Sequence, residues 1–476
     1  MAQHPSSSTE SYPLMQADLD NFSQLAARAS EWAVEFTQQL PAKKVACLAD
    51  VLPPPRQVAR SGEGFAEALA QFQQHIAPYL SASAGPRYWG FVTGGASPAA
   101  LLGDWLVSAI DQNVGSPGDS IATAIELQTI QWLLEMVALP ASFKGILTTG
   151  ATASNLLGLI CGRQFAGQQQ RVDVAEEGLS GVAVEVFSAT PHASTVKCLA
   201  MLGLGRKSWR PISCLPGSEA MNVADLADQL AASSCPGKIV VASAGTVTGN
   251  DFDDLRAIAD LCEQHRAWLH VDAAFGLFSR LLENMSDDSL GLERADSITS
   301  DAHKWLNVPY DCGLFFTRHP ALLQQSCSAD AAYLRTESGL PSMMNLGIEN
   351  SRRFRALPLW LSLQAYGVEG VRHMVKANCL QAQQFAEWLQ AAEEFDLLKP
   401  CRMNVVVFRP READQETVAT FLRTINESGE VYMTPGVWQG KPAIRAAFSN
   451  WRTSGDDVTR VCRLLSELVR EPVKCK

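Results

Sequence analysis

The sequence predicts an α/β protein whose main sheet is mostly parallel. From about residue 120, short apolar runs alternate with amphipathic stretches. The apolar runs predict buried strands, with helical stretches such as 254–266 between several of them; these runs lie at 145–149, 182–189, 238–245, 267–274, 297–302 and 312–318. Alternation of this kind is typical of a parallel sheet covered by helices. A chain of 476 residues has room for about two or three domains.

Different patterns flank this α/β region. Upstream, residues 16–40 and 63–80 predict helices, and the prolines of VLPPPR (51–56) break the chain between them. Downstream, the pattern predicts helices at 352–366, 368–392, 415–428 and 456–470, and strands at 404–409, near 430–434 and at 442–448. We therefore expect an N-terminal helical segment (1–85), a large α/β domain (86–350) and a smaller α+β C-terminal domain (351–476).

Composition and charge limit the possible partners. The net charge of −11 argues against nucleic acid, which requires a basic surface. The twelve cysteines are scattered singly without a CxxC pair, which indicates reduced thiols in a cytoplasmic protein. The N-terminus lacks a signal-peptide pattern, and no apolar run of about 18 residues predicts a membrane span. The eight histidines show no HxxxH or HExxH pattern, so we expect no metal.

Polar residues follow several predicted strands, where open α/β sheets bind ligands. TTGATASN (148–155) stands between the strand at 145–149 and a helix. Gly150 allows a tight turn, and free N–H groups at the start of the helix favour an anion. A plain strand–helix turn with Ser154 as the N-cap is the alternative. No lysine stands at the spacing of a P-loop.

Three single side chains occupy equivalent positions. His192 follows the strand at 182–189, where it could stack on a flat ring, carry a proton or have no role. Asp272 closes an apolar strand, and a buried carboxylate there needs a protonated pyridine nitrogen, a helix cap or a salt bridge. Lys304 follows the strand at 297–302 and is suited to a Schiff base if partly desolvated, whereas a surface lysine has no such role.

These four features together predict one cofactor. An anion cradle, a stacking histidine, an acid for a ring nitrogen and an amine for an aldehyde are the groups that pyridoxal 5'-phosphate (PLP) needs. Each lies at a strand end of one predicted domain, so we expect a PLP enzyme.

With these residues in place, the sequence resembles the group II PLP-dependent amino-acid decarboxylases, which include glutamate, aromatic-amino-acid and diaminobutyrate decarboxylases. HVDAA (270–274) and AHKW (302–305) carry the resemblance, supported by SRRFRALPLW (351–360) and IRAAFSNWRTSGDDV (444–458). It implies the PLP-dependent transferase fold (fold type I, aspartate-aminotransferase superfamily), with a mostly parallel seven-stranded sheet. It also implies a homodimer with active sites near the interface.

The resemblance implies a role for each candidate. Lys304 forms the Schiff base with PLP, Asp272 pairs with the ring nitrogen, and His192 stacks on the ring near the substrate carboxylate. The other expected cofactor contacts are Ala151, Thr152, Ala153 and Ser154 in the phosphate loop, Thr246 near the ring hydroxyl or the substrate, and Asp301 and His303 beside the lysine. The family often has asparagine at the position of Asp301, and a carboxylate there would repel the phosphate.

The expected reaction is decarboxylation of an L-amino acid to its amine and CO2. The alternatives are an aldehyde-forming oxidative deaminase, a carbon–carbon lyase or an aldolase of the same fold, or a PLP-binding protein without activity. Many relatives carry on a mobile loop a tyrosine that helps to protonate Cα. The similar stretch at 336–351 contains no tyrosine, and Tyr333 lies just upstream. Loss of that tyrosine is associated in the family with aldehyde formation, unless His192 or a residue of the other subunit supplies the proton.

The resemblance also suggests where the substrate side chain binds. Residues Trp89, Phe91, Val92 and Thr93 lie where the family lines this pocket, and their aromatic content could suit an aromatic substrate. Packing in the core or in a dimer interface is the alternative. Near the C-terminus, Arg445 and Arg452 are candidates to face an acidic substrate, although structural arginines are commoner.

Overall fold

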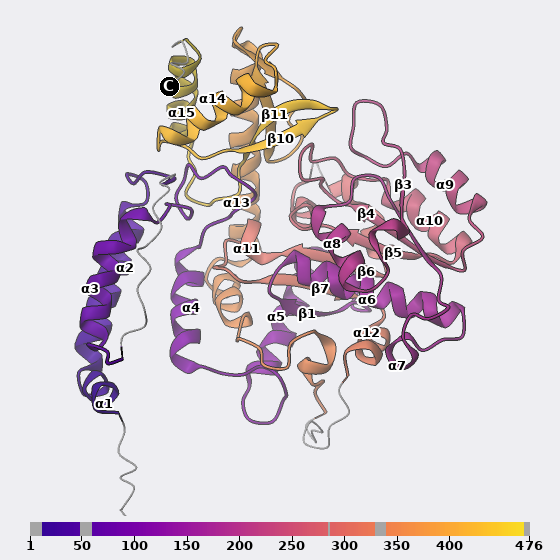
Figure 1. Cartoon of the computed structure of the whole chain (residues 1–476), viewed down its shortest axis with the longest axis horizontal. Coiled ribbons are helices and arrows are strands. Elements are labelled where there is room, and N and C mark those ends of the chain that lie inside the picture. Colours follow the sequence, from indigo (N-terminus) through magenta and orange to yellow (C-terminus); the bar gives the residue numbers. More distant parts are fainter. Residues whose placement is uncertain (1–11, 48–59, 284–285, 329–338, 471–476) are drawn as a thin grey trace, which may run out of the picture.

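The computed structural model describes residues 12–47, 60–283, 286–328 and 339–470. Two sheets and a group of N-terminal helices organise these residues (Figure 1). VLPPPR (51–56) and Tyr333 lie outside the described residues. None of the helices in the described part of the chain combines the length and apolar character that crossing a bilayer requires.

The larger sheet has seven strands in the order β1-β7-β6-β5-β4-β2-β3. Strands β2 to β6 pair in parallel, and β7 runs antiparallel to both β1 and β6. The strands are β1 (Lys144–Thr148), β2 (Val184–Ser188), β3 (Trp209–Pro211), β4 (Gly237–Ser243), β5 (Trp268–Asp272), β6 (Ser297–Asp301) and β7 (Gly313–Thr317). The predicted mostly parallel seven-stranded sheet is confirmed.

Helices cover both faces of this sheet because both faces are apolar. Along β4, Ile239 and Val241 join the buried cluster under one set of helices, and Val240 joins the cluster on the opposite face. The first face is covered by α6 (Ala151–Gln169), α8 (Ala193–Met201) and α12 (Pro320–Cys327), and the second by α5 (Ala122–Met136), α9 (Val223–Ala232) and α10 (Leu255–His265). Two short helices complete the domain: α7 (Val174–Glu177) and α11 (Ala302–Trp305).

The N-terminal helices stand apart from the sheet (Figure 1). The expected helix at 16–40 is divided at Asn21 into α1 (Pro13–Asp20) and α2 (Phe22–Gln39). The expected helix at 63–80 is α3 (Phe65–His75), followed by a short 3-10 turn. Neither α1 nor α2 contains a buried residue. Helix α4 (Pro98–Ile110), which the sequence analysis did not predict, begins with Ser97 as its N-cap.

The C-terminal part contains a four-stranded antiparallel sheet in the order β10-β11-β9-β8. Its elements are β8 (Phe395–Leu397), β9 (Val405–Pro410), α14 (Gln415–Glu427), β10 (Thr434–Trp438), β11 (Lys441–Ala447) and α15 (Gly455–Arg470). The strand expected near 430–434 lies at 434–438 instead, because the residues before it form a turn at Gly429 and pair with residues 87–89. The domain boundaries at 85/86 and 350/351 stay a prediction.

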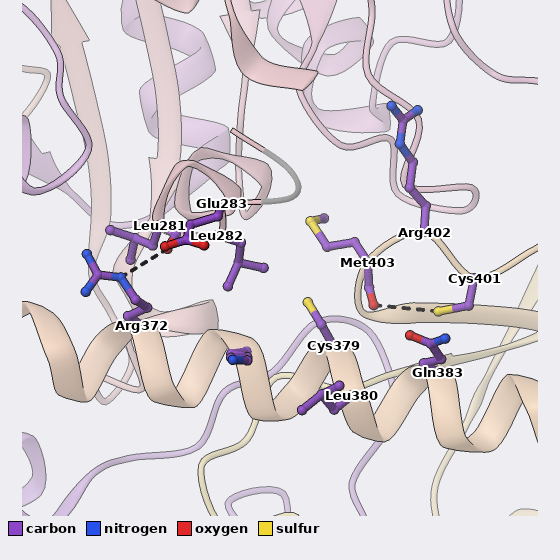
Figure 2. A pocket seen from close by; sticks show the side chains of 11 residues that line it. Leu281, Leu282, Glu283, Arg372, Cys379, Leu380, Gln383, Cys401, Arg402 and Met403 are labelled. Carbon is purple, nitrogen blue, oxygen red and sulfur yellow. Dashed lines mark hydrogen bonds between the residues drawn. The ribbon is translucent and has the colours of Figure 1, made fainter. Parts of the chain in front are cut away.

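Helix α13 (Ala356–Ala391) runs between the two sheets (Figure 1). Its backbone is not helical at Gly367, so it corresponds to the two helices predicted at 352–366 and 368–392. Farther along, α13 borders a cavity of about 380 Å3 between the two parts of the chain, lined by residues that include Leu281, Leu282, Arg372, Leu380 and Met403 (Figure 2). Arg372 Nε donates to the Leu281 carbonyl at 3.1 Å, which ties α13 to the large domain.

A buried ion pair joins the segment before α13 to the large sheet. Arg352 Nη2 lies 2.7 Å from Glu126 Oε1, and the two side chains are 1% and 0% exposed. Glu126 Oε1 accepts a hydrogen bond from Leu147 N–H at 3.0 Å, and Arg352 donates to the Leu147 carbonyl at 2.7 Å. Because Leu147 lies in β1 just before Gly150, this pair fixes the strand that leads into α6.

Arg352→Met should lower the free energy of unfolding by about 3–5 kcal/mol, because it leaves Glu126 buried without its counter-charge. Urea unfolding followed by circular dichroism measures this loss. The double variant with Glu126→Leu should recover much of the stability, since both charges are then absent. Arg470→Met, which breaks the exposed pair with Glu394, is the matched control and should leave the midpoint unchanged. Equal losses in the two single variants would count against a special role for the buried pair.

Candidate active site

A cavity of about 520 Å3 lies where the parallel strands of the large sheet end. Five residues that the sequence analysis selected line it together: Ala151, His192, Thr246, Asp272 and Lys304. They come from segments that follow five different strands, so the parallel sheet is what brings them together. Trp209, Phe275 and several small residues complete the wall.

Lys304 lies in α11, immediately after β6. Its ammonium is 2.9 Å from Asp301 Oδ2 and 5.7 Å from the centre of the Phe275 ring. The lysine side chain is 20% exposed, whereas Asp301 is 2% exposed. Gly94 packs so closely on the Lys304 carbonyl that any side chain at Gly94 would collide with it. The lysine is therefore held by its backbone while its amine remains at the cavity.

Asp272 ends β5 and is 9% exposed. Its Oδ1 accepts from Ala274 N–H at 3.1 Å, and its Oδ2 accepts from Asn155 Nδ2 at 2.9 Å. A buried carboxylate is tolerated when donors of this kind surround it. Each oxygen retains further acceptor capacity toward a cationic group in the cavity.

His192 is the N-cap of α8, and its ring is fixed from one side. Nδ1 lies 2.7 Å from Ser194 Oγ and 3.3 Å from Ser194 N–H. Burial lowers the pKa of His192, while the nearby charge of Asp272 opposes this effect. The imidazole is therefore held at the cavity mainly in its neutral form at pH 7.

The predicted phosphate loop is the start of α6. Gly150 is the N-cap with φ 144°, and no side chain caps the helix there. A Cβ at this position would lie 3.1 Å from the His303 ring. Uncapped first-turn N–H groups make an anion site. Ser154 is fully buried and its hydroxyl lies 2.8 Å from Thr148 Oγ1, so its side chain supports the turn.

Three further predicted contacts lie beside Lys304 or across the cavity. His303 Nε2 is 3.6 Å from Asp301 Oδ1, and burial lowers the pKa of this histidine. Asp301 Oδ1 is buried and has no hydrogen-bond partner among the described residues. Thr246 is 5% exposed, and its Oγ1 accepts from Asp251 N–H at 3.0 Å. Its hydroxyl hydrogen is thus free to donate at the cavity wall.

The residues proposed for the substrate side chain separate into different environments. Trp89 is buried in the C-terminal core, with its ring 4.3 Å from that of Phe448. Phe91 is 58% exposed, whereas Val92 and Thr93 are buried. None of these residues borders the 520 Å3 cavity within this chain.

The two candidate arginines also differ. Arg445, in β11, is 7% exposed, and within the described part of the chain its Nε and Nη2 lack hydrogen-bond partners. Burial lowers its pKa to about 10. Its charge acts on His192, which places it near the cavity. Arg452 is half-buried, and its guanidinium lies over the Trp451 ring.

Four side chains that the sequence analysis did not select complete the site. These side chains are Asn155, Ser194, His270 and Ser297. They form a chain of hydrogen bonds that supports Asp272 and His192. Asn155 and His270 fall inside the motifs TTGATASN and HVDAA. A polar residue inside an otherwise apolar strand, such as His270, was the available signal. Its partners are far apart in the sequence, so the pattern could not name them.

Comparison with known proteins identifies the family. A family model described as the pyridoxal-dependent decarboxylase conserved domain matches residues 51–411. The chain belongs to the pyridoxal-dependent decarboxylase family. It is 30% identical over 406 residues to an aromatic-L-amino-acid decarboxylase of Bacillus atrophaeus, covering 81% of this chain and 82% of the relative. It is 25% identical over 469 residues to a 3,4-dihydroxyphenylacetaldehyde synthase of Drosophila melanogaster, covering 93% and 90%.

Solved structures support the same fold for this decarboxylase. The crystal structure of Oryza sativa TDC with PLP and tryptamine superposes with a TM-score of 0.88 at 21% identity, covering 98% of this chain and 99% of the other. The expected membership of the group II PLP decarboxylases and the fold type I assignment are confirmed. The protein is a PLP-dependent carboxy-lyase, and PLP is its cofactor.

The residues of the cavity fit this cofactor. An amine, a carboxylate, a neutral histidine and an uncapped helix start surround one cavity. Bound PLP supplies an electron sink for the bond that breaks, and the protein supplies orientation and charge. The orphaned polar atoms of Arg445 and Asp301 are further groups that a bound ligand could satisfy.

The buried histidine of β5 predicts a pH dependence of stability. Burial lowers the pKa of His270 to about 4, whereas an unfolded histidine titrates near 6.5. Between these values the unfolded chain binds a proton that the folded chain does not. Stability should therefore fall as the pH falls, by up to about 3 kcal/mol from this residue. His270→Gln should flatten the slope in urea unfolding between pH 7.5 and 4.5. His192 and His303 act in the same direction and remain in the variant, and an unchanged slope would refute the assignment.

Proposed function

We propose that this decarboxylase converts an L-amino acid to its amine and CO2, with Lys304 forming the Schiff base that holds the cofactor. The observation that supports this proposal is the lining of one cavity by Lys304, Asp272 and His192. In the proposed arrangement, Asp272 faces the ring nitrogen and His192 covers the ring. To hold the cofactor aldehyde, the amine of Lys304 would have to move away from Asp301, whose Oδ2 lies 2.9 Å from it.

The remaining contacts follow from the same arrangement. We propose that the phosphate binds at the start of α6, through residues Ala151 to Ser154, with Thr152 and Ala153 contributing most. His303 and Asp301 flank this group, and Thr246 reaches the ring hydroxyl or the substrate. Because His303 is neutral at pH 7, it can donate one hydrogen bond to the phosphate region while Asp301 bonds to Lys304.

An aromatic amino acid is the proposed substrate class. The relatives with similar sequences include an aromatic-L-amino-acid decarboxylase of Catharanthus roseus and tryptophan decarboxylase 1 of Oryza sativa subsp. japonica. Arg445 is buried, and its Nε and Nη2 have no partner in the segments that the structure describes, which supports contact with a substrate carboxylate. The exposed ring of Phe91 supports a contribution of this residue to the pocket of a second subunit, whereas Trp89 is buried against Phe448.

Aldehyde formation is the second candidate reaction. The stretch 336–351 contains no tyrosine, and several relatives are named as aldehyde synthases, including the phenylacetaldehyde synthase of a Rosa hybrid cultivar. In that reaction the substrate also loses CO2, but molecular oxygen is consumed and peroxide, ammonia and an aldehyde are released. A carbon–carbon lyase or aldolase of this fold is a further alternative, for which CO2 would not be a product.

Incubation of the PLP-loaded protein with a panel of L-amino acids should release CO2 and one amine, most rapidly from an aromatic substrate. Chromatography of the amine, together with CO2 and peroxide assays, distinguishes the candidates. Peroxide and aldehyde in place of amine would favour the oxidative reaction. Lys304→Ala should lower the rate by at least about a thousandfold, because the residue that exchanges with the substrate amine is lost. No CO2 from any amino acid would overturn the proposal.

We also propose a cytoplasmic homodimer. The described cysteines are all free thiols, which supports a reducing compartment. Large apolar side chains of the N-terminal helices and α4 are exposed, among them Met15 at 70%, Phe22 at 65% and Leu102 at 55%. Exposed apolar surface of this extent marks an interaction site. A second copy of the chain is the proposed occupant, since most such assemblies are symmetric dimers.

Size-exclusion chromatography with light scattering should give twice the chain mass of 51.6 kDa. Phe22→Glu combined with Leu102→Glu should increase the monomer fraction at low concentration, because a charge would be buried in the interface. Val437→Glu is the matched control, since Val437 is 61% exposed on β10 of the C-terminal sheet. A wild-type protein that stays monomeric at high concentration would contradict the proposed dimer.

A further inference from the structure

One asparagine lies between the acid and the histidine of the active site. Asn155 is in the second turn of α6 and is 0% exposed. Its Nδ2 donates to Asp272 Oδ2 at 2.9 Å and to Ser194 Oγ at 3.1 Å. Ser194 Oγ is in turn 2.7 Å from His192 Nδ1. The two hydrogens of the Asn155 amide thus bond to the acid directly and to the histidine through Ser194.

The directions of these bonds follow from the chemistry of the donors. An amide nitrogen only donates, so Ser194 Oγ must accept from Asn155, and its own hydrogen is then available for His192 Nδ1. The Ser194 N–H also points to Nδ1, at 3.3 Å. Two donors directed at Nδ1 require a lone pair there. The neutral imidazole of His192 therefore carries its hydrogen on Nε2.

The orientation of the Asn155 amide is fixed by two buried residues, His270 and Ser297. Trp268 Nε1 donates to Ser297 Oγ at 3.1 Å, which leaves the hydroxyl hydrogen for His270 Nδ1 at 2.8 Å. The His270 hydrogen is then on Nε2, which lies 2.8 Å from Asn155 Oδ1. Burial holds His270 in this neutral form. A flipped amide would instead place its oxygen against the carboxylate of Asp272.

We propose that Asn155 is a positioning residue that fixes the Asp272 carboxylate and the Nε2–H tautomer of His192 at the same time, with His270 and Ser297 setting the orientation of its amide. The inference rests on the proposed function, because it assumes that Asp272 and His192 face the cofactor ring. It also explains why the two groups differ toward the cavity. The Asp272 carboxylate accepts hydrogen bonds, whereas the Nε2–H of His192 donates one.

The tautomer of the wild-type protein tests the bond directions without any substitution. In cofactor-free protein labelled with 15N at its eight histidines, the His192 ring should show a protonated Nε2 and an unprotonated Nδ1 above its pKa. The resonances are assigned by their loss in His192→Gln. A hydrogen on Nδ1 of the neutral ring would overturn the proposal.

The affinity for PLP in the absence of any amino acid tests the positioning role. Asn155→Leu keeps the approximate volume but removes both donors, so the PLP dissociation constant should rise at least about tenfold. The His192 ring should also lose its single tautomer. Asn426→Leu is the matched control, because among the described residues this buried amide bonds only to the Met433 backbone, in the C-terminal domain. Equal changes in the two variants would refute a positioning role.

A conservative series separates positioning from folding. His270→Gln keeps a donor for Asn155 Oδ1 and should retain PLP affinity within about threefold, whereas His270→Leu should lose about tenfold or more. Equal affinity in both would contradict the proposed role of His270. These readouts need no turnover. A protein that binds PLP through this network yet releases no CO2 would overturn the proposed reaction and leave this inference intact.

Discussion

The carboxylate of Asp272, buried at the carboxyl end of β5, is the constraint on which the rest of the site depends. Such a charge costs free energy unless donors surround it, so a polar group of α6 must lie against the strand. The helix approaches closely enough because Gly158 faces the ring of His270, where any side chain would collide. The same approach brings the uncapped start of α6 to the cavity. One packing contact thereby places the acid and the anion site together.

The C-terminal domain contributes to the site without supplying the central residues. Asp272 ends a strand of the larger sheet and Lys304 and His192 follow two others, whereas Arg445 reaches the neighbourhood of His192 from β11. Asn307, just after Lys304, donates to the Ser449 carbonyl and accepts from Trp451 N–H, both at 3.0 Å. These buried bonds hold the lysine-bearing segment against the C-terminal domain, so the geometry of the cavity depends on both parts of the chain.

Decarboxylases and aldehyde synthases both occur among the relatives with similar sequences. A lysine, an acid and a histidine that line one cavity are compatible with either reaction, because both reactions release CO2 from an amino acid. The difference must therefore arise where protons are delivered or oxygen is admitted. His192, neutral and fixed through Nδ1, lines the cavity in which either reaction would take place.

Several features followed from the sequence because their causes are local. The apolar run at 238–245 predicted the buried strand found as β4, and HVDAA and AHKW predicted the acid and the lysine at strand ends. Other features lacked a local cause. Strand β3 has only three residues, and it exists because β2 offers a parallel edge. Helix α4 begins with the helix-start signal Ser97–Pro98, but it lies before the region of alternating strands and helices and was not predicted.

Tertiary structure alone decided which candidates share a cavity. Trp89 is aromatic and follows the family pattern for a pocket, yet it packs on Phe448, because an indole ring suits an apolar core as well as an apolar pocket. Asn155 and Asp272 are separated by 117 residues, and only the closeness of α6 to β5 makes them partners. The sequence thus determined the chemistry available at each strand end. The packing of helices on the sheet decided which of those groups act together, since hydrogen bonds depend on distance and direction that no local pattern encodes.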